Sequence, residues 1–259
     1  MHREGKMGSG QRSPGGGDRI LFLGTADGFP CPTRHHAAVL CNVDGRSLLL
    51  DCGEPCSETF RRMDMGFHVP DAVVISHSHS DHVGGLPMFI QACWLQGRTN
   101  PLAVYLPAGV IEPLRSWLEA CYLFQEDLAF PLQLLPLTEG PFMAFPNTHL
   151  NRTRRERSAR YPKVCYESYS IVLEAGGKRI GYSGDLGAPE DLAALLPLDI
   201  LICELAHFTP QALADFLRDK PVKKLLLTHL SRPMMADLPE VKRILAGAVF
   251  SREGDVVEV

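Results

Sequence analysis

Short apolar runs alternate with longer segments of helical spacing from residue 19 to the end of the chain. The short runs are rich in valine, isoleucine and leucine and end at turn residues such as Asp44 and Gly45, which is typical of β-strands. The longer segments carry bulky apolar residues three and four positions apart, which is the pattern of a helix with one buried face. We expect strands over residues 19–23, 37–41, 47–50, 71–76, 102–106, 132–137, 142–145, 169–174, 179–183, 199–204, 223–228 and near 256. We expect helices over residues 54–65, 84–96, 107–121, 189–196, 210–220 and 238–246.

The order of these elements predicts one α/β domain over residues 18–259. Strands come early in each half and helices punctuate them, with no short repeat and no linker, so two similar βα halves are the simplest arrangement. Residues 1–17 contain His, Arg, Lys, Gly and Ser without an apolar run, and we expect a disordered tail or a tag remnant there, not a secretion signal. No window has the roughly 20 uninterrupted apolar residues that cross a bilayer, so we expect no membrane partner.

The composition is that of a globular protein from a reducing compartment. Apolar residues make up 45% of the chain and charged residues 22%, which is ordinary for a protein with a sizeable core. The eight cysteines lack the regular spacing of a disulfide framework, which favours reduced thiols and a cytoplasmic location. Cys52 and Cys56 lie four positions apart and could form half of a soft-metal site, but two buried apolar side chains are the simpler interpretation.

One local run of basic residues changes the picture given by the net charge. The charge of −4 offers no overall reason to expect nucleic acid as a partner. Between positions 152 and 163, however, only Glu156 offsets six basic residues: Arg152, Arg154, Arg155, Arg157, Arg160 and Lys163. Most such runs are solvated loops, whereas a run at the mouth of an active site would favour a phosphorylated or polyanionic substrate.

Three of the ten histidines fall in the stretch HSHSDH, directly after the strand predicted over residues 71–76. His77 and His79 project to the same side of an extended chain, because side chains alternate with a period of two. Asp81 and His82 follow at a turn and can face a second ion nearby. Burying three imidazoles and a carboxylate together is costly unless something coordinates them. The stretch therefore predicts a metal site.

Three further potential ligands each follow a predicted strand: His149, Asp185 in YSGD and His229 in LTHL. Active-site residues gather where strands end and loops converge. Each residue alone is more often structural, as a hydrogen-bonded histidine or a turn aspartate. Imidazole and carboxylate donors suit zinc, and also manganese or iron where oxygen donors are numerous. We expect two divalent transition metal ions if all of these side chains meet.

HSHSDH, preceded by LLLDCG and followed in order by the three later ligands, resembles the metallo-β-lactamase superfamily over nearly the whole chain after the tail. The segments FLGT, DCGE, ESYSI and THLSR are similar to the ribonuclease Z branch and its phosphodiesterase relatives. The resemblance implies a four-layer αββα sandwich with the metals at one edge of the two sheets. It implies that the first ion is held by His77, His79 and His149, the second by Asp81, His82 and His229, and that Asp185 bridges both.

The resemblance also implies roles for neighbouring residues. The nucleophile would be a hydroxide shared by the two ions, and Asp81 is counted with the catalytic residues as well as with the ligands. Asp51 would accept an N–H from a ligand histidine, with a strand-end cap as the alternative. Glu204 and His207, in CELAHF, occupy the place where the ribonuclease Z branch has an acidic residue and a histidine that help to protonate the leaving alcohol. The separate downstream histidine motif of that branch is absent here, so His207 is our candidate general acid, with a structural histidine as the alternative.

These features lead to ranked hypotheses about function. We expect a dinuclear metal phosphodiesterase that acts on RNA ends, cyclic nucleotides or another small phosphodiester, with Ser231 and Arg232 in contact with a phosphate. Arg232 capping a helix or facing solvent is the alternative. A lactonase or thioesterase is the second hypothesis, and a non-catalytic metal-binding module is less favoured because no ligand is missing. The long Gly- and Pro-rich arm that grips transfer RNA in typical ribonuclease Z is not recognisable, and residues 88–94 could be core or the face of a homodimer.

Overall fold

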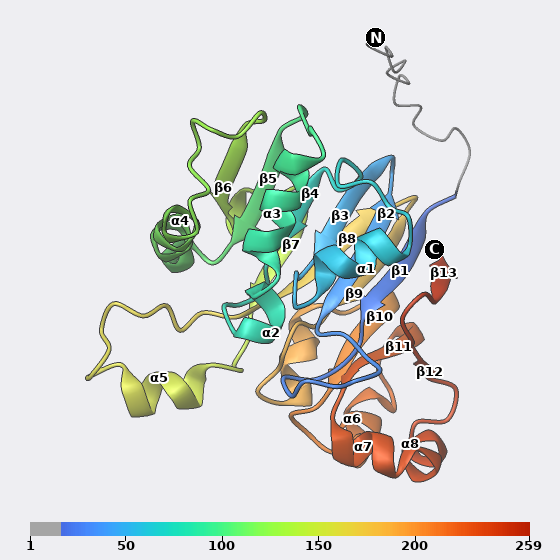
Figure 1. Cartoon of the computed structure of the whole chain (residues 1–259). Coiled ribbons are helices and arrows are strands. Elements are labelled where there is room, and N and C mark those ends of the chain that lie inside the picture. Colours follow the sequence, from blue (N-terminus) through green and yellow to red (C-terminus); the bar gives the residue numbers. More distant parts are fainter. Residues whose placement is uncertain (1–16) are drawn as a thin grey trace.

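The computed structural model, which describes residues 17–259, contains two β-sheets that lie face to face (Figure 1). The first sheet has the order β13 (Val256–Glu258), β1 (Arg19–Gly24), β2 (Ala38–Val43), β3 (Arg46–Leu50), β4 (Ala72–Val74), β5 (Leu102–Leu106) and β6 (Leu132–Pro136). The second has the order β12 (Val249–Phe250), β11 (Val222–Leu230), β10 (Leu198–Leu205), β9 (Lys178–Tyr182), β8 (Tyr169–Ala175) and β7 (Met143–Pro146). The tail predicted over residues 1–17 lies outside the described residues, except for Gly17.

The inner faces of the two sheets form the central core. On β1, Ile20 and Phe22 pack toward the second sheet, whereas Leu21 and Leu23 pack toward the helices on the outer face. This division follows from the period-two alternation of side chains along a strand. Residues of β8 such as Ile171 join Ile20 and Phe22 from the opposite sheet. The apolar run predicted as a strand is therefore buried on both faces.

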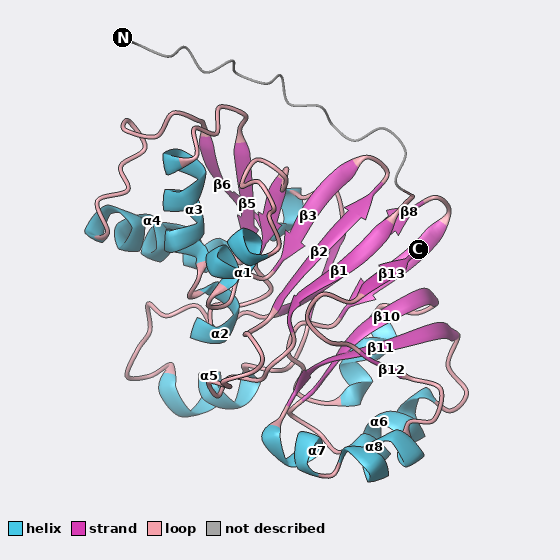
Figure 2. Ribbon diagram, turned by 45° about the vertical axis from the view of Figure 1, so that its right-hand side comes forward, coloured by secondary structure: helices cyan, strands magenta, loops and turns pink. Residues whose placement is uncertain are grey.

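Helices cover the outer face of each sheet (Figure 2). On the first sheet lie α1 (Cys56–Arg62), α3 (Leu86–Leu95) and α4 (Ile111–Ala120), which follows the short 3-10 helix η1 (Ala108–Val110). On the second lie α6 (Pro210–Leu217), α8 (Leu238–Ile244) and the 3-10 helix η3 (Pro189–Ala194). The remaining short helices are α2 (Ser80–Val83), η2 (Leu137–Glu139), α5 (Asn151–Arg157) and α7 (Arg232–Ala236). The predicted four-layer αββα sandwich is confirmed.

Several local predictions need correction. The helix predicted over 84–96 is α3, and the turn predicted at Asp81 and His82 is instead the short helix α2; the helix predicted over 189–196 is a 3-10 helix. Five short elements were not predicted: α2, η2, α5, α7 and β12. α5 has no buried residue, so it lacks the apolar periodicity that reveals a helix in a sequence. His229 was expected after a strand but lies within β11.

Other features of the described residues bear on the sequence predictions. All eight cysteines are free thiols, and Cys52 and Cys56 are buried in the core beneath the first sheet. Among residues 17–259 no helix is long and apolar enough to span a membrane. On α3, Met88 and the helix-ending Leu95 are 55% and 73% exposed, whereas Phe89 is fully buried. The predicted 88–94 surface is thus part core and part open face.

Candidate metal centre

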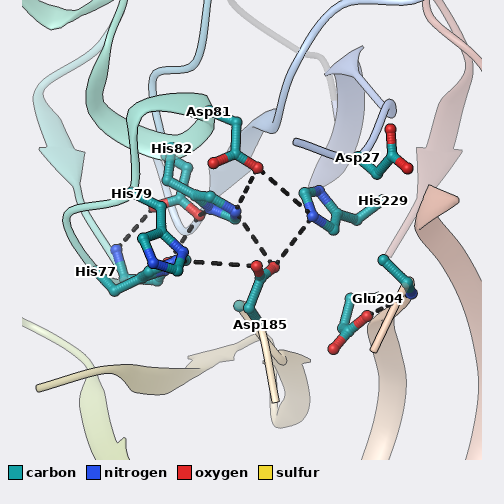
Figure 3. Close-up of polar contacts among 12 residues, drawn as sticks. Asp27, His77, His79, Asp81, His82, Asp185, Glu204 and His229 are labelled. Carbon is teal, nitrogen blue, oxygen red and sulfur yellow. Dashed lines mark hydrogen bonds and ion pairs between the residues drawn. The ribbon is translucent and has the colours of Figure 1, made fainter. Parts of the chain in front are cut away.

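The predicted ligands meet at one edge of the two sheets, where strands from both halves of the chain end. His77 and His79 follow β4, and Asp81 and His82 lie on α2. His149 and Asp185 each come three residues after a strand, β7 and β9, and His229 is the second-last residue of β11. Figure 3 shows Asp185 at the centre of the cluster, between the histidines of HSHSDH and His229. The convergence expected from the sequence is therefore present, although the side chains come from residues more than 150 positions apart.

The first group of potential ligands consists of His77, His79, His149 and Asp185. Nδ1 of His79 lies 3.0 Å from Nε2 of His77 and 3.2 Å from Nε2 of His149. Oδ2 of Asp185 lies 3.8 Å from Nε2 of His77 and 3.7 Å from Nε2 of His149. Two ligand atoms that are each about 2.1 Å from a tetrahedral ion lie about 3.4 Å apart. The spacing of the four donor atoms matches that of a metal-binding cage.

The second group consists of Asp81, His82, Asp185 and His229. Here the other oxygen of Asp185, Oδ1, lies 3.2 Å from Nε2 of His82 and 3.4 Å from Nε2 of His229. Oδ2 of Asp81 lies 3.5 Å and 3.7 Å from the same two nitrogens. Asp185 thus presents one carboxylate oxygen to each group. Neither Cys52 nor Cys56 belongs to a potential ligand group among the described residues.

Two buried atoms of the second group lack a hydrogen-bond partner among residues 17–259 and indicate that a cation lies between them. Nε2 of His82 and Oδ1 of Asp185 are buried without a hydrogen-bond partner in the described structure. Because Nδ1 of His82 faces the Asp51 carboxylate at 2.7 Å and must donate to it, a neutral His82 presents a lone pair at Nε2. Two lone pairs 3.2 Å apart repel unless a cation lies between them. The donor set therefore fits divalent metal ions.

The pKa values of the histidines agree with this interpretation. Burial lowers the pKa of His77 well below its usual range and lowers that of His149 to about 4. Both imidazoles are then neutral and free to act as ligands at neutral pH. Burial alone would also lower the pKa of His82, but Asp185 and Asp51 outweigh it and raise that pKa well above its usual range. The carboxylates of Asp185 and Asp51 therefore stabilise a positive charge at the position of His82.

Asp51 is buried behind the second group and is the acceptor of four hydrogen bonds. Its Oδ1 accepts from the Ser76 amide at 2.7 Å. Its Oδ2 accepts from the Ser76 hydroxyl, from Nδ1 of His82 and from the Tyr182 hydroxyl at 2.6 Å. This is the contact to a ligand histidine that the sequence predicted. Ser76 and Tyr182 were missed, although Ser76 directly precedes HSHSDH and Tyr182 is the first residue of YSGD.

Left-handed backbone conformations orient two of these side chains, those of Asp51 and His229. Glu204 pairs with Thr228 and Leu205 pairs with Leu230, so His229 is the extra residue of a β-bulge. Its φ of 51° and the φ of 56° at Asp51 lie in the left-handed region, which costs a non-glycine residue of order 1 kcal/mol or more. Bulges of this kind turn a side chain toward a site. Before Asp185, Gly184 has φ 56°, and a Cβ there would lie 2.8 Å from the Tyr169 carbonyl oxygen.

Glu204 and His207 lie beside the cluster. The Glu204 carboxylate accepts from the amides of Leu186, Ala206 and His207 and lies 3.0 Å from Nδ1 of His207. Nε2 of His207 lies 3.8 Å from Oδ2 of Asp185. Burial opposes charging of His207, but the hydrogen bond and charge of Glu204 outweigh it and raise the pKa of this imidazole. A partly exposed histidine that holds a proton next to the candidate metal ligands can serve as a proton donor.

The residues after His229 connect the site to the loop that follows β1. The guanidinium of Arg34 donates to the carbonyl oxygens of Thr25 and Leu230 at 3.1 and 3.0 Å, so it ties the two sheets together at this edge. The guanidinium carbon of Arg232 lies 3.6 Å from the centroid of the Phe29 ring. Ser231 precedes α7 and makes no capping hydrogen bond. Neither Ser231 nor Arg232 belongs to the two ligand groups.

Known proteins resemble this chain in sequence and in fold. A model of the family described as "Anti-Pycsar protein Apyc1" matches residues 19–229. Ribonuclease Z from Methanosarcina mazei is 39% identical over 266 aligned positions, which cover 82% of this chain and 87% of the relative. Because the whole chain has only 259 residues, that relative carries inserted residues that this chain lacks.

Solved structures share the fold at lower identity. The short form of human tRNase Z (ELAC1) superposes with a TM-score of 0.70 and 21% identity, covering 92% of this chain and 98% of that one. The metallo-β-lactamase fold protein YhfI from Bacillus subtilis has a TM-score of 0.72 and 21% identity, covering 93% and 99%. These likenesses extend over nearly the full length of both chains.

Proposed function

On the premise that this chain belongs to the anti-Pycsar protein Apyc1 family and, like its ribonuclease Z relatives, to the metallo-β-lactamase superfamily, we propose that it is a metal-dependent phosphodiesterase. The observation that carries the proposal is the pair of ligand groups that share Asp185, with His207 beside them. Imidazoles and carboxylates in this arrangement serve hydrolysis with a metal-activated water, not attack by a side chain.

We assign the seven ligands to two ions, zinc in the first instance, with manganese or iron as alternatives. The first group would hold one ion, the second group the other, and Asp185 would contribute to both. When bound, such ions polarise a phosphoryl oxygen and make a water molecule more acidic. By accepting from Nδ1, Asp51 selects the neutral tautomer of His82 in which the Nε2 lone pair is available to a metal ion.

His207 is the candidate proton donor to the leaving oxygen. Its Nδ1 faces the Glu204 carboxylate, which accepts only, so Nδ1 keeps its hydrogen and a second proton on Nε2 is available on the side of Asp185. Glu204 is a positioning residue in this proposal, because its carboxylate is held by three backbone amides. Arg232, and with it Ser231, would contact a substrate phosphate.

The substrates we propose are RNA ends, cyclic nucleotides or other small phosphodiesters. Several curated relatives are named ribonuclease Z, which favours a nucleotide-derived substrate. A cytoplasmic location, a homodimer and the extent of the single domain stay predictions.

A substrate panel tests the proposal. The metal-loaded protein, supplied with zinc or manganese, should hydrolyse bis(p-nitrophenyl) phosphate and leave a panel of lactones and thioesters untouched. Asp81→Ala should abolish turnover while circular dichroism shows a retained fold, because it removes one ligand of the second group. Asp219→Ala, at an exposed position of the surface, is the matched control and should keep full activity. Turnover of the esters alone, or of neither class with either metal, would overturn the assignment.

A further inference from the structure

The loop between β1 and β2, residues 25–37, is fastened to the edge of the sandwich where the second ligand group lies. The Leu230 amide donates to the Thr25 carbonyl oxygen at 3.1 Å, and Leu230 directly follows a ligand histidine of that group. Farther along the loop, Nδ1 of His36 lies 2.8 Å from the Asp27 carbonyl oxygen, which is a hydrogen-bond distance. The backbone of the loop is therefore held in place beside the ligands.

The tip of this loop lies against one of the ligands. A Cβ built on Gly28 would lie 3.1 Å from Oδ2 of Asp81, so the backbone at Gly28 runs along the ligand carboxylate and a side chain there would be crowded. Asp27 lies on the same side of the cluster as Asp81 and His229 (Figure 3). Phe29 is the next residue after Gly28, and consecutive Cα atoms are about 3.8 Å apart. Phe29 is thus placed at the rim of the second ligand group.

The Phe29 ring is stacked against a cation. Phe29 is 52% exposed, so burial in the core does not account for its position. The guanidinium carbon of Arg232 lies 3.6 Å from the centroid of the ring, which is van der Waals contact between the two planar groups. In the other four cation–aromatic contacts within residues 17–259 the cation lies 5.3 to 5.8 Å from the centroid. The contact between Phe29 and Arg232 is therefore the closest of its kind in the described chain.

Arg232 reaches this rim from the other sheet. It is the third residue after His229 in β11, whereas Phe29 belongs to the loop that follows β1 of the first sheet. The Arg232 side chain is exposed and forms no ion pair within the described range. A guanidinium that stacks by its face keeps its N–H donors at the edge of the plane. The edge of the Arg232 guanidinium is therefore available to an anion.

We propose that Phe29 is a positioning residue for Arg232: its ring holds the guanidinium flat, so that the N–H edge meets a phosphoryl oxygen of the substrate at the second ligand group. An unsupported arginine side chain populates many rotamers, and binding must restrict them. Contact with the ring restricts them before the substrate arrives, which improves affinity by pre-organisation. The proposal rests on the proposed function, in which Arg232 contacts the phosphate, and adds a residue that neither ligand group contains.

A double-mutant cycle between Phe29 and Arg232 tests the proposal on the metal-loaded protein. With bis(p-nitrophenyl) phosphate, Phe29→Leu should raise KM about threefold, the size expected for the loss of an exposed cation–π contact, and should leave kcat near that of the wild type. In the Arg232→Ala background the same substitution should have no further effect, because a residue that acts through another is not additive with it. An equal rise of KM in both backgrounds would mean that Phe29 contacts the substrate directly, and it would overturn the proposal.

Two further variants separate the aromatic face from apolar bulk. Phe29→Tyr keeps the ring and should retain the wild-type KM, whereas leucine offers apolar bulk without a π face. Tyr122→Leu, at an aromatic residue that is 78% exposed beyond the end of α4, is the matched control and should leave KM unchanged. A wild-type KM in Phe29→Leu, or a KM in Phe29→Tyr as high as in Phe29→Leu, would also overturn the proposal.

Binding of inorganic phosphate keeps this test independent of turnover. Isothermal titration calorimetry on the metal-loaded protein should give a Kd for phosphate about threefold higher in Phe29→Leu than in the wild type, and the same Kd in Arg232→Ala and in the double variant. If the wild-type protein hydrolyses no phosphodiester but this pattern of Kd values is found, the proposed function fails and the positioning role stands. If phosphodiesters are hydrolysed but the Kd for phosphate does not depend on Phe29, the positioning role fails alone.

Discussion

Replacing Asp51 by asparagine isolates the role of one buried carboxylate at the metal centre. Asp51 accepts at Oδ1 from the Ser76 amide and at Oδ2 from three donors, among them Nδ1 of His82 and the Tyr182 hydroxyl. Asparagine has a single acceptor oxygen and an NH₂ group. If its oxygen takes the place of Oδ2, the NH₂ group faces the Ser76 amide, which cannot rotate away. If its oxygen takes the place of Oδ1, the NH₂ group faces His82.

The expected magnitude follows from these contacts. At least one hydrogen bond to a charged acceptor is lost in either orientation, which costs about 1.5–3 kcal/mol of the free energy of unfolding. Changing the partner of a metal-ligating histidine typically lowers metal affinity by 10–100-fold, or about 1.4–2.8 kcal/mol of binding free energy. We expect Asp51→Asn to show both effects, with the affinity loss confined to the ion held by the second ligand group.

Competition between the protein and a chromophoric chelator measures the affinity for each ion, and urea unfolding of the metal-free protein measures stability. Asp71→Asn is the matched control. Asp71 is an exposed carboxylate at the opposite end of β4, and its Oδ2 accepts one hydrogen bond, from the Ser47 amide at 2.9 Å. One oxygen of asparagine can keep that bond, so both quantities should stay near those of the wild type. Wild-type metal affinity in Asp51→Asn would refute the reasoning.

Three further predictions follow from the site. Glu204→Gln should shift the alkaline limb of the pH–rate profile to lower pH, because Glu204 raises the pKa of His207 against the effect of burial. A proton donor loses activity as the pH rises through its pKa, so a lower pKa moves this limb down. An alkaline limb that does not move would exclude His207 as the donor. Arg232→Ala should raise KM for a phosphodiester by roughly tenfold through loss of a charge-assisted contact, whereas Arg243→Ala, an exposed arginine paired with Glu240, should not. Chelation should lower the melting temperature and added zinc or manganese should restore it, because an ion that binds only the folded state stabilises it; a melting curve indifferent to metal would contradict the two ligand groups.

The regular elements were predictable because their signals are local. The strand over 102–106 was predicted with its observed bounds, since an apolar run between turn residues defines it without reference to the rest of the chain. α5 was missed for the converse reason, because NRTRRER buries nothing and carries no periodicity. α2 was also missed, because its four residues are too few to show a helical period and were predicted as a turn.

The sequence by itself determined which side chains form the candidate metal centre, because the residue types of HSHSDH and the later strand-end residues already specify the donors. It could not determine how they face one another, since distances between residues far apart in the chain arise only when the two sheets pack. Tertiary structure alone decided that Asp185 turns one oxygen to each group, that Asp51 also accepts from Tyr182, and that Arg34 joins Thr25 to Leu230. It also decided that two residues of the basic run, Arg154 and Lys163, line one pocket, because their relative positions depend on how the segment after β7 folds.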